Sequence, residues 1–147
     1  MKTAKIITAL IFATVMTVSC KLENSHNGAL DGYWKLYAVD TLANETTSDL
    51  GSSSIFWAVE KDILMVRDNN DEVRREYVFR FEHTDSTLRL WDAQLYDKKA
   101  GSQAVEDAAE LAKYGINKTE ETFTIDHLTS RRMALSTNEL RLSFKKL

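Results

Sequence analysis

The chain has 147 residues, carries 19 lysine and arginine residues against 22 aspartate and glutamate residues, and has a formal net charge of −3. This acidic balance argues against nucleic acid as a partner and against a polybasic membrane-binding surface. With one cysteine no internal disulfide is available, so buried apolar side chains must stabilise a fold whose length suits one domain.

The N-terminal segment has the pattern of a secretory signal. Lys2 and Lys5 precede an uncharged, largely apolar run over residues 6–19. The run is too short to span a hydrocarbon core about 30 Å thick as a permanent helix. Its removal, with the two lysines before it, leaves 17 basic and 22 acidic side chains.

The single cysteine directly follows this segment. Thr17-Val18-Ser19-Cys20 resembles a bacterial lipobox, in which a signal peptidase cuts before a cysteine that carries diacylglycerol. The alternative is an ordinary signal peptide followed by a free thiol, which is a liability in a secreted chain. The resemblance implies attachment to a membrane through a lipid on Cys20, in the bacterial cell envelope and at the outer membrane. We therefore predict a lipoprotein signal peptide over residues 1–19, a lipidated tether over 20–29 and one domain over 30–147.

The first strand of the domain begins directly after the tether. Trp34, Leu36 and Ala38 recur every second residue, the spacing of a strand that buries one face. Gly32 allows backbone or a neighbouring ring to approach closely where the strand begins. Residues 40–54 are rich in Thr, Ser, Asn, Asp and Gly, which indicates a long loop of the kind that carries binding functions.

Further strand patterns follow at hairpin spacing, with one interruption. We expect strands over 54–59, 63–67, 75–82 and 87–91, and again over 122–128, 132–136 and 139–145. Between the two groups, apolar residues at helical spacing over 102–114 predict a helix that Ser102 caps and Gly115 ends. The apolar stripe of this helix is narrow, so we expect it on the outside of the fold, or as a lid. The total of about eight strands favours a closed antiparallel barrel or a sandwich.

Both ends of the domain carry a family resemblance. Leu30-x-Gly32-x-Trp34-x-Leu36 and the closing Leu140-x-Leu142-x-Phe144-Lys145-Lys146 resemble the small lipocalin-like lipoproteins of the Bacteroidetes. The resemblance implies a mainly β fold, an eight-stranded antiparallel lipocalin-like barrel with one helix inserted before the last three strands. In lipocalins at large, the Trp of Gly-x-Trp closes one end of the barrel under an arginine. Arg141 is the candidate for that arginine, and Arg132 is the alternative.

The alternating strands predict an inward-facing set, which leaves two functions open. A small eight-stranded barrel either fills its interior with side chains or holds one small ligand. We expect an anchored protein that binds a small apolar or amphipathic ligand inside the barrel. The alternative is an accessory module with a filled barrel, which binds an envelope protein or a glycan through loops and exposed aromatic residues. The candidate ligand-lining residues are Leu36, Tyr77, Phe79, Phe81, Leu88, Leu90, Phe123, Ile125, Met133 and Leu142.

Two tryptophans are candidates for such an exposed surface. Trp91 is opposite in parity to Leu88 and Leu90, and Trp57 has Phe56 and Ala58 as neighbours on the other face. Outward aromatic side chains on a barrel wall often mark a binding surface. The alternative is that the predicted helix covers one of the two.

No catalytic or metal-binding pattern stands out. His26, His83 and His127 are far apart and lack the spacing of metal ligands, and the sequence contains no Gly-x-Ser-x-Gly. A lipid on Cys20 would remove the only thiol nucleophile. We therefore expect a protein that is not an enzyme, with no catalytic residues, no metal site and no cofactor.

Overall fold

The computed structural model describes residues 25–147, so the predicted signal peptide, Cys20 and the first part of the tether lie outside the described residues. None of the helices in this part of the chain combines the length and the apolar character that a membrane crossing requires. The elements are η1(Gly28–Leu30), β1(Gly32–Thr41), β2(Thr46–Asp49), β3(Ile55–Glu60), β4(Ile63–Asp68), β5(Glu76–His83), β6(Thr87–Tyr96), β7(Gln103–Ala104), η2(Ala108–Tyr114), β8(Glu121–Leu128), β9(Arg132–Ser136) and β10(Leu140–Lys146).

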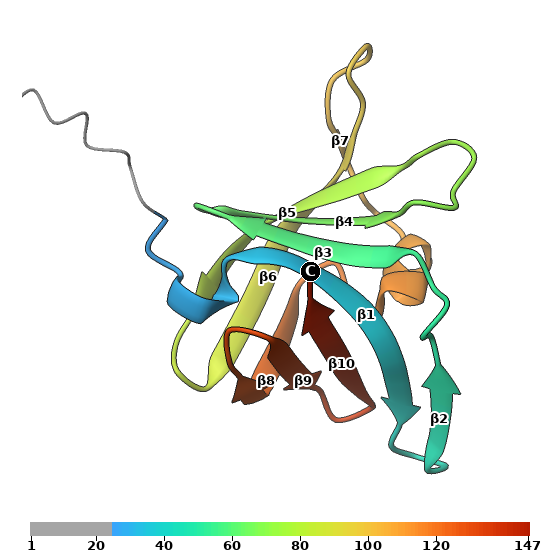
Figure 1. Cartoon of the computed structure of the whole chain (residues 1–147). Coiled ribbons are helices and arrows are strands. Elements are labelled where there is room, and N and C mark those ends of the chain that lie inside the picture. Colours follow the sequence, from blue (N-terminus) through green and yellow to red (C-terminus); the bar gives the residue numbers. More distant parts are fainter. Residues whose placement is uncertain (1–24) are drawn as a thin grey trace, which may run out of the picture.

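Eight of these strands close into a ring (Figure 1). Their order is β10-β9-β8-β6-β5-β4-β3-β1, and β1 pairs in turn with β10, so the sheet returns on itself. All neighbouring pairs are antiparallel. The short strands β2 and β7 pair with β1 and β6, respectively. The predicted mainly β, eight-stranded antiparallel barrel is therefore confirmed, with η2 before the last three strands.

The barrel has two ends that are built differently. At the Trp34 end, β1 begins, β10 finishes, and tight turns follow β3, β5 and β8. At the opposite end, which we name the Tyr114 end, β4 passes into β5, β9 passes into β10, and η2 enters. The expected loop over 40–54 lies at this end and contains β2, all of whose residues are exposed.

The ordered domain begins earlier than predicted. Residues 25–29 were expected in the tether, but they are bonded to the β3–β4 turn at the Trp34 end. The Asn27 side-chain amide donates to the Lys61 carbonyl at 2.7 Å, and the Lys61 backbone N–H donates to the Ser25 hydroxyl at 3.1 Å. Residues 25–29 are therefore attached to the domain by hydrogen bonds.

The prediction for Trp57 is wrong. Ile55, Trp57 and Val59 face the interior and are buried, whereas Phe56 faces outward and is only partly buried. Every residue from Ile55 to Val59 is apolar, so alternation alone cannot say which face is inside. Strand register decides the question, because Trp57 lies opposite the inward-facing Trp34 on β1.

The segment predicted as an outer helix is shorter than expected and lies across one end of the barrel, with two of its side chains buried. η2 is a 3-10 helix that Asp107, not Ser102, caps, and Gly115 ends it with a φ of 83°. Leu111 and Tyr114 are fully buried. Instead of covering the wall from outside, η2 closes the Tyr114 end of the barrel by inserting these two side chains.

Candidate functional site

The Trp34 end is closed by side chains that satisfy one another. The Trp34 Nε1 donates to the Leu30 carbonyl at 2.8 Å, within η1 and the start of β1. The Lys146 Nζ lies 4.6 Å from the centroid of the Trp34 ring and donates to the carbonyls of Ala29 at 2.9 Å and Asp31 at 2.5 Å. This end therefore leaves no room for a ligand.

Lys146, not Arg141, is the cation over the tryptophan, so that prediction is wrong. Arg141 faces outward, with 52% of its side chain exposed, and its Nε lies 3.4 Å from an Asp126 carboxylate oxygen. Lys146 lies opposite Trp34 in the β1–β10 pair and shares the inward parity of Phe144. That parity is the sequence signal by which Lys146 could have been found.

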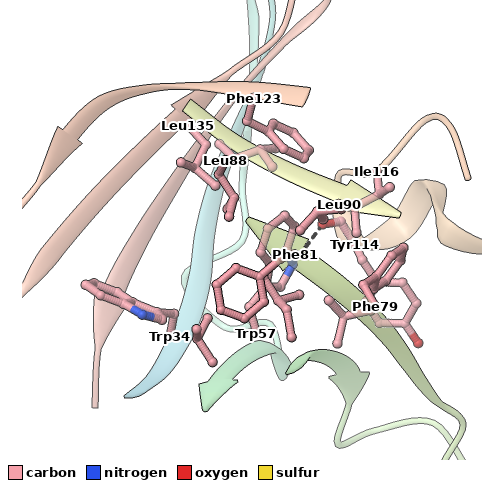
Figure 2. Packing of buried hydrophobic residues seen from close by; sticks show 14 of the residues in the cluster. Trp34, Trp57, Phe79, Phe81, Leu88, Leu90, Tyr114, Ile116, Phe123 and Leu135 are labelled. Atoms are coloured by element: carbon pink, nitrogen blue, oxygen red, sulfur yellow. Dashed lines mark hydrogen bonds between the residues drawn. The ribbon is translucent and has the colours of Figure 1, made fainter. Parts of the chain in front are cut away.

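The barrel interior is filled with side chains (Figure 2). The Trp57 ring lies 4.9 Å from the Phe144 ring and 5.7 Å from the Phe123 ring, centroid to centroid. Burial of each such large side chain stabilises the fold by roughly 1.5–3 kcal/mol without any ligand. Of the ten candidate ligand-lining residues, Ile125 is partly buried and packs against this core. The other nine are at most 8% exposed: Leu36, Tyr77, Phe79, Phe81, Leu88, Leu90, Phe123, Met133 and Leu142.

Residues 105–116, which we name the plug, complete this packing at the Tyr114 end. Leu111, Tyr114 and Ile116 are fully buried, and Figure 2 shows Tyr114 and Ile116 among the side chains of the core. The Trp57 Nε1 donates to the Tyr114 carbonyl at 3.1 Å, the bond drawn as a dashed line in Figure 2. The plug therefore occupies interior space at the end through which a ligand would enter.

The rim of the barrel holds the plug through polar contacts. The Tyr77 hydroxyl donates to the Glu110 carboxylate at 3.0 Å, and burial together with this bond raises the pKa of Tyr77 to about 12. The Lys113 Nζ lies 3.4 Å from an Asp68 carboxylate oxygen and 3.5 Å from one of Asp71. Ion pairs that involve a partly exposed lysine each contribute little to stability. Burial of the apolar side chains of the plug therefore contributes most of the energy that holds it.

One polar atom of the plug is left without a partner. The Tyr114 hydroxyl is buried and has no hydrogen-bond partner among the described residues. Burial, with a smaller contribution from the charges of Asp71 and Asp68, raises the pKa of Tyr114 to about 12. An unpaired buried polar group costs about 1–3 kcal/mol, so the plug is less well satisfied than the Trp34 end.

A cleft opens beside the plug, on the outside of the Tyr114 end. It has a volume of about 840 Å³, within the usual range for small-molecule sites. Two connections form it, the β4–β5 turn and the segment that leaves β6, which project from this end of the barrel (Figure 1). We name it the mouth cleft, and its lining residues are Arg67, Asp68, Asn69, Val73, Arg74, Arg75, Glu76, Leu95, Tyr96, Asp97 and Lys98.

Two of the four cations of the mouth cleft are already paired. The Arg67 Nε donates to the Tyr33 hydroxyl at 2.6 Å, and an Arg67 guanidinium N lies 3.4 Å from a Glu76 carboxylate oxygen. The Arg75 Nε donates to the Asp71 carboxylate at 3.0 Å. These two guanidinium groups are therefore largely committed to the protein.

The acids of the mouth cleft are also engaged. Asp68 accepts from the Ser54 hydroxyl at 2.5 Å, a bond that lowers the pKa of Asp68. Asp97 accepts from the backbone N–H groups of Lys99 at 2.7 Å and Ala100 at 3.0 Å, which lowers its pKa as well. Both carboxylates are therefore ionised at neutral pH and keep their negative charge.

Comparison with known proteins identifies the family of the chain. Residues 14–147 match a family of lipocalin-like domains. The chain belongs to that family. A lipocalin-like protein from Bacteroides uniformis ATCC 8492 is 17% identical, covers 82% of this chain and 100% of its own, and superposes with a TM-score of 0.63. An uncharacterized protein from Bacteroides eggerthii DSM 20697 is 19% identical, covers 80% and 98%, and has a TM-score of 0.61. No match was found among curated proteins.

These findings confirm the family resemblance that Gly32-x-Trp34 and the C-terminal strand indicated. At such low identity the two crystal structures establish the fold of this lipocalin-like domain and carry no ligand over to it.

The outer wall of the lipocalin-like domain carries three aromatic rings that lie under arginines, those of Tyr33, Tyr37 and Trp91. The Arg89 guanidinium lies 5.0 Å from the centroid of the partly buried Trp91 ring. Arg132, the alternative closing arginine, instead lies 5.6 Å from the centroid of the Tyr37 ring. The predicted surface pair therefore reduces to Trp91, which is shielded by its cation.

A second cleft of the lipocalin-like domain is polar. It has a volume of about 630 Å³ and lies between the start of β8 and the β9–β10 turn. Glu121, buried at its edge, has a pKa raised by desolvation. Within residues 25–147, no group of three or more His, Cys, Asp or Glu side chains could hold a metal ion.

Sequence reasoning missed the mouth cleft. Residues 68–74 fall between two predicted strands and residues 95–98 follow another, and no function was predicted for either segment. The available signal was Val73, an apolar residue between acidic and basic neighbours in a predicted turn. An apolar side chain in such a polar connection has no place in the core to fill.

Proposed function

We propose that this lipocalin-like protein is anchored in the bacterial envelope through a lipid on Cys20, at the outer membrane, and binds a small amphipathic ligand in the mouth cleft. The observation that carries the proposal is the contrast between a filled interior and an open cleft lined by both apolar and charged side chains. Lipocalin-like domains are ligand-binding in type. Here the ligand site has moved from the interior to the rim.

The position of the cleft supports an anchored binding protein. The described chain starts at the Trp34 end, where residues 25–29 are bonded to the β3–β4 turn. The mouth cleft lies at the opposite end of the barrel. A lipid on Cys20 would therefore hold the Trp34 end toward the membrane and present the cleft toward the aqueous side.

The proposed role is binding, without catalysis. Lipocalin-like families are generally non-enzymatic. Arg67 pairs with Glu76, Arg75 pairs with Asp71, and Asp97 accepts from backbone N–H groups, contacts that position side chains and do not activate a nucleophile. The proposal requires no metal and no cofactor.

The filled barrel also fits the second hypothesis, in which an envelope protein or a glycan binds to the outer surface. Tyr96, with 44% of its surface exposed, and Trp91 are the aromatic residues that such a partner would contact. Ligand binding is favoured because Tyr96 lies within a concave site of small-molecule size.

Native mass spectrometry tests the proposal. The chain carrying Cys20→Ser, which removes the lipidation site, is exchanged through a lysate of its native host and measured intact. We expect a discrete small-molecule adduct that disappears on denaturation.

Two variants place the adduct. Tyr96→Ser should abolish it, and Ile63→Ser should retain it, because Ile63 is equally exposed (45% against 44%) but lies at the Trp34 end. A bare mass in the unaltered chain, or equal loss in both variants, would contradict the mouth cleft as the site. Co-purification of a protein or glycan in its place would support the second hypothesis.

A further inference from the structure

We propose that the ligand of the mouth cleft is an organic anion with an apolar chain or ring, whose acidic group is bound by Arg74 and Lys98. This inference rests on the proposed function and adds the chemical class of the ligand. Three features of the cleft support this class: its exposed apolar side chains, its two unpaired cations and the ordered β4–β5 turn.

The apolar part of the ligand has a wall to contact. The large hydrophobic residues that are exposed in residues 25–147 are Leu42, Ile63, Val73, Tyr96 and Leu147. Val73, 75% exposed, and Tyr96, 44% exposed, both line the mouth cleft, although they are far apart in sequence. Leu95, which packs against the core, also lines the cleft. Apolar residues that gather in one cleft indicate a surface that a partner covers.

The residues that line the cleft include four cations and three carboxylates, so the formal charge of the lining is +1. Arg67 and Glu76 pair with each other, Arg75 pairs with Asp71, and Asp68 and Asp97 are engaged as described above. In contrast, the side chains of Arg74 and Lys98 make no hydrogen bond or ion pair with any described residue. Arg74 lies on the β4–β5 turn and Lys98 on the segment after β6, so the two unpaired cations come from the two connections that form the cleft.

Arg74 is presented by a rigid turn. The Asp71 side chain, only 5% exposed, accepts from the Val73 backbone N–H at 3.0 Å and from the Arg75 guanidinium at 3.0 Å. The Arg74 backbone N–H donates to the Asp71 carbonyl at 2.9 Å, with Arg74 held at a φ of 53°. A left-handed φ is unfavourable for a non-glycine residue, and such conformations persist where the surrounding structure enforces them. The turn thus places Val73 and Arg74 side by side at the cleft with little freedom to move away.

The place of the cleft favours a free molecule over a membrane lipid. The Trp34 end carries the N-terminal segment, and the cleft lies at the other end of the barrel. A volume of about 840 Å³ accommodates a small amphiphile and not a macromolecule. We therefore commit to a soluble, single-chain or single-ring organic acid as the occupant.

A matched series of probes tests the charge. Decanoate, 1-decanol and decylamine share one apolar chain and differ in charge, and each is titrated into the Cys20→Ser chain at neutral pH and low salt by calorimetry. Because charge-assisted hydrogen bonds are about twice as strong as neutral ones, we expect decanoate to bind about tenfold more tightly than decanol. Decylamine should bind more weakly than decanol.

A pair of double variants locates the charge. Arg74→Gln with Lys98→Gln should lower the affinity for decanoate about tenfold and leave that for decanol unchanged. Arg131→Gln with Lys145→Gln removes the same charge at the Trp34 end, where both residues are exposed, and should change neither affinity.

The outcomes separate the two proposals. If decanol binds as tightly as decanoate, the cleft binds apolar ligands and the inference is wrong, while the proposed function stands. If no probe binds and no adduct forms from lysate, the proposed function itself fails. If both double variants weaken decanoate equally, the preference arises from net charge, and the assignment to Arg74 and Lys98 is wrong.

Discussion

The two ends of the barrel are closed by the same kinds of groups, but the polar atom of the buried aromatic side chain is hydrogen-bonded at one end and not at the other. At each end a buried aromatic ring lies beneath a lysine, with Lys146 at 4.6 Å from Trp34 and Lys113 at 5.1 Å from Tyr114. The Trp34 nitrogen is hydrogen-bonded to Leu30, four residues away, whereas the Tyr114 hydroxyl has no partner among the described residues. The Trp34 end is thus closed by neighbouring residues that are hydrogen-bonded to one another, whereas the Tyr114 end is closed by the inserted plug.

The difference explains why the mouth cleft lies at the Tyr114 end. A barrel end that is closed by residues adjacent in sequence needs only short turns between its strands, as at the Trp34 end. An end closed by an inserted segment needs longer connections around it, and such connections form clefts and carry binding functions. Variants at both ends test this contrast.

The largest effect is expected from Trp34→Ala. The ring is fully buried and its Nε1 is bonded, so the change should lower the free energy of unfolding by about 3–5 kcal/mol. Trp91→Ala, which removes a partly buried ring from the outer wall, should cost about 1 kcal/mol. Urea unfolding followed by circular dichroism measures both, and equal losses would show that the Trp34 end is no special closure.

Gly115→Ala tests how tightly the plug fits. An added Cβ would lie 2.6 Å from Leu142 Cδ2, and the φ of +83° is unfavourable for alanine. Strain and overpacking together should cost about 2–4 kcal/mol. Gly101→Ala is the matched control, because its φ is +79° with open space around it, and should cost about 1 kcal/mol. A loss at Gly115 no greater than at Gly101 would mean that the plug can shift away from β10.

Lys146→Met tests the cation of the Trp34 end. The variant keeps the aliphatic contact with Trp34 but loses two hydrogen bonds to carbonyls and the cation–π contact, a cost of about 1–2 kcal/mol. Lys145→Met, on the exposed neighbour, should change stability by less than about 0.5 kcal/mol. If Lys145 and Lys146 behave alike in urea unfolding, the lysine is not part of the closure.

Tyr114→Phe should stabilise the protein. The variant removes a buried hydroxyl without a partner and keeps the ring, so the free energy of unfolding should rise by up to about 1 kcal/mol. Tyr77→Phe removes a hydroxyl that is bonded to Glu110 and should lower it by a similar amount. Opposite signs in thermal unfolding would support the contrast between the two hydroxyls, and a loss in both would indicate that Tyr114 is bonded to solvent.

An alkaline effect is expected from the two tyrosines of the Tyr114 end. Tyrosine in an unfolded chain has a pKa of about 10, and the pKa values of Tyr77 and Tyr114 in the folded protein are about 12. The unfolded state therefore loses these protons first, and stability should fall as pH rises from 10 to 12. In urea unfolding across this range, the double Tyr→Phe variant should show a shallower fall than the unaltered protein. Parallel curves would mean that these tyrosines do not drive the loss.

Sequence reasoning succeeded where one face of a strand is polar. Strand β5 alternates Tyr77, Phe79 and Phe81 with polar or smaller residues, and all three rings are buried. It failed where alternation is absent, as in the wholly apolar run around Trp57, because only pairing with β1 selects the buried face. For the closing cation, parity supported Lys146, but the family resemblance directed attention to an arginine.

The sequence by itself determined the mainly β class, the approximate strand positions and the inserted segment before the last three strands, because these depend on local periodicity and turn residues. Only the tertiary structure decided that Leu111 and Tyr114 fill the barrel and that Val73 and Tyr96 share a cleft. These contacts join segments distant in the chain, and strand pairing and ring closure bring them together. The short, alanine-rich η2 buries Leu111 and Tyr114 because the end of a closed barrel offers apolar surface that only an inserted segment can cover.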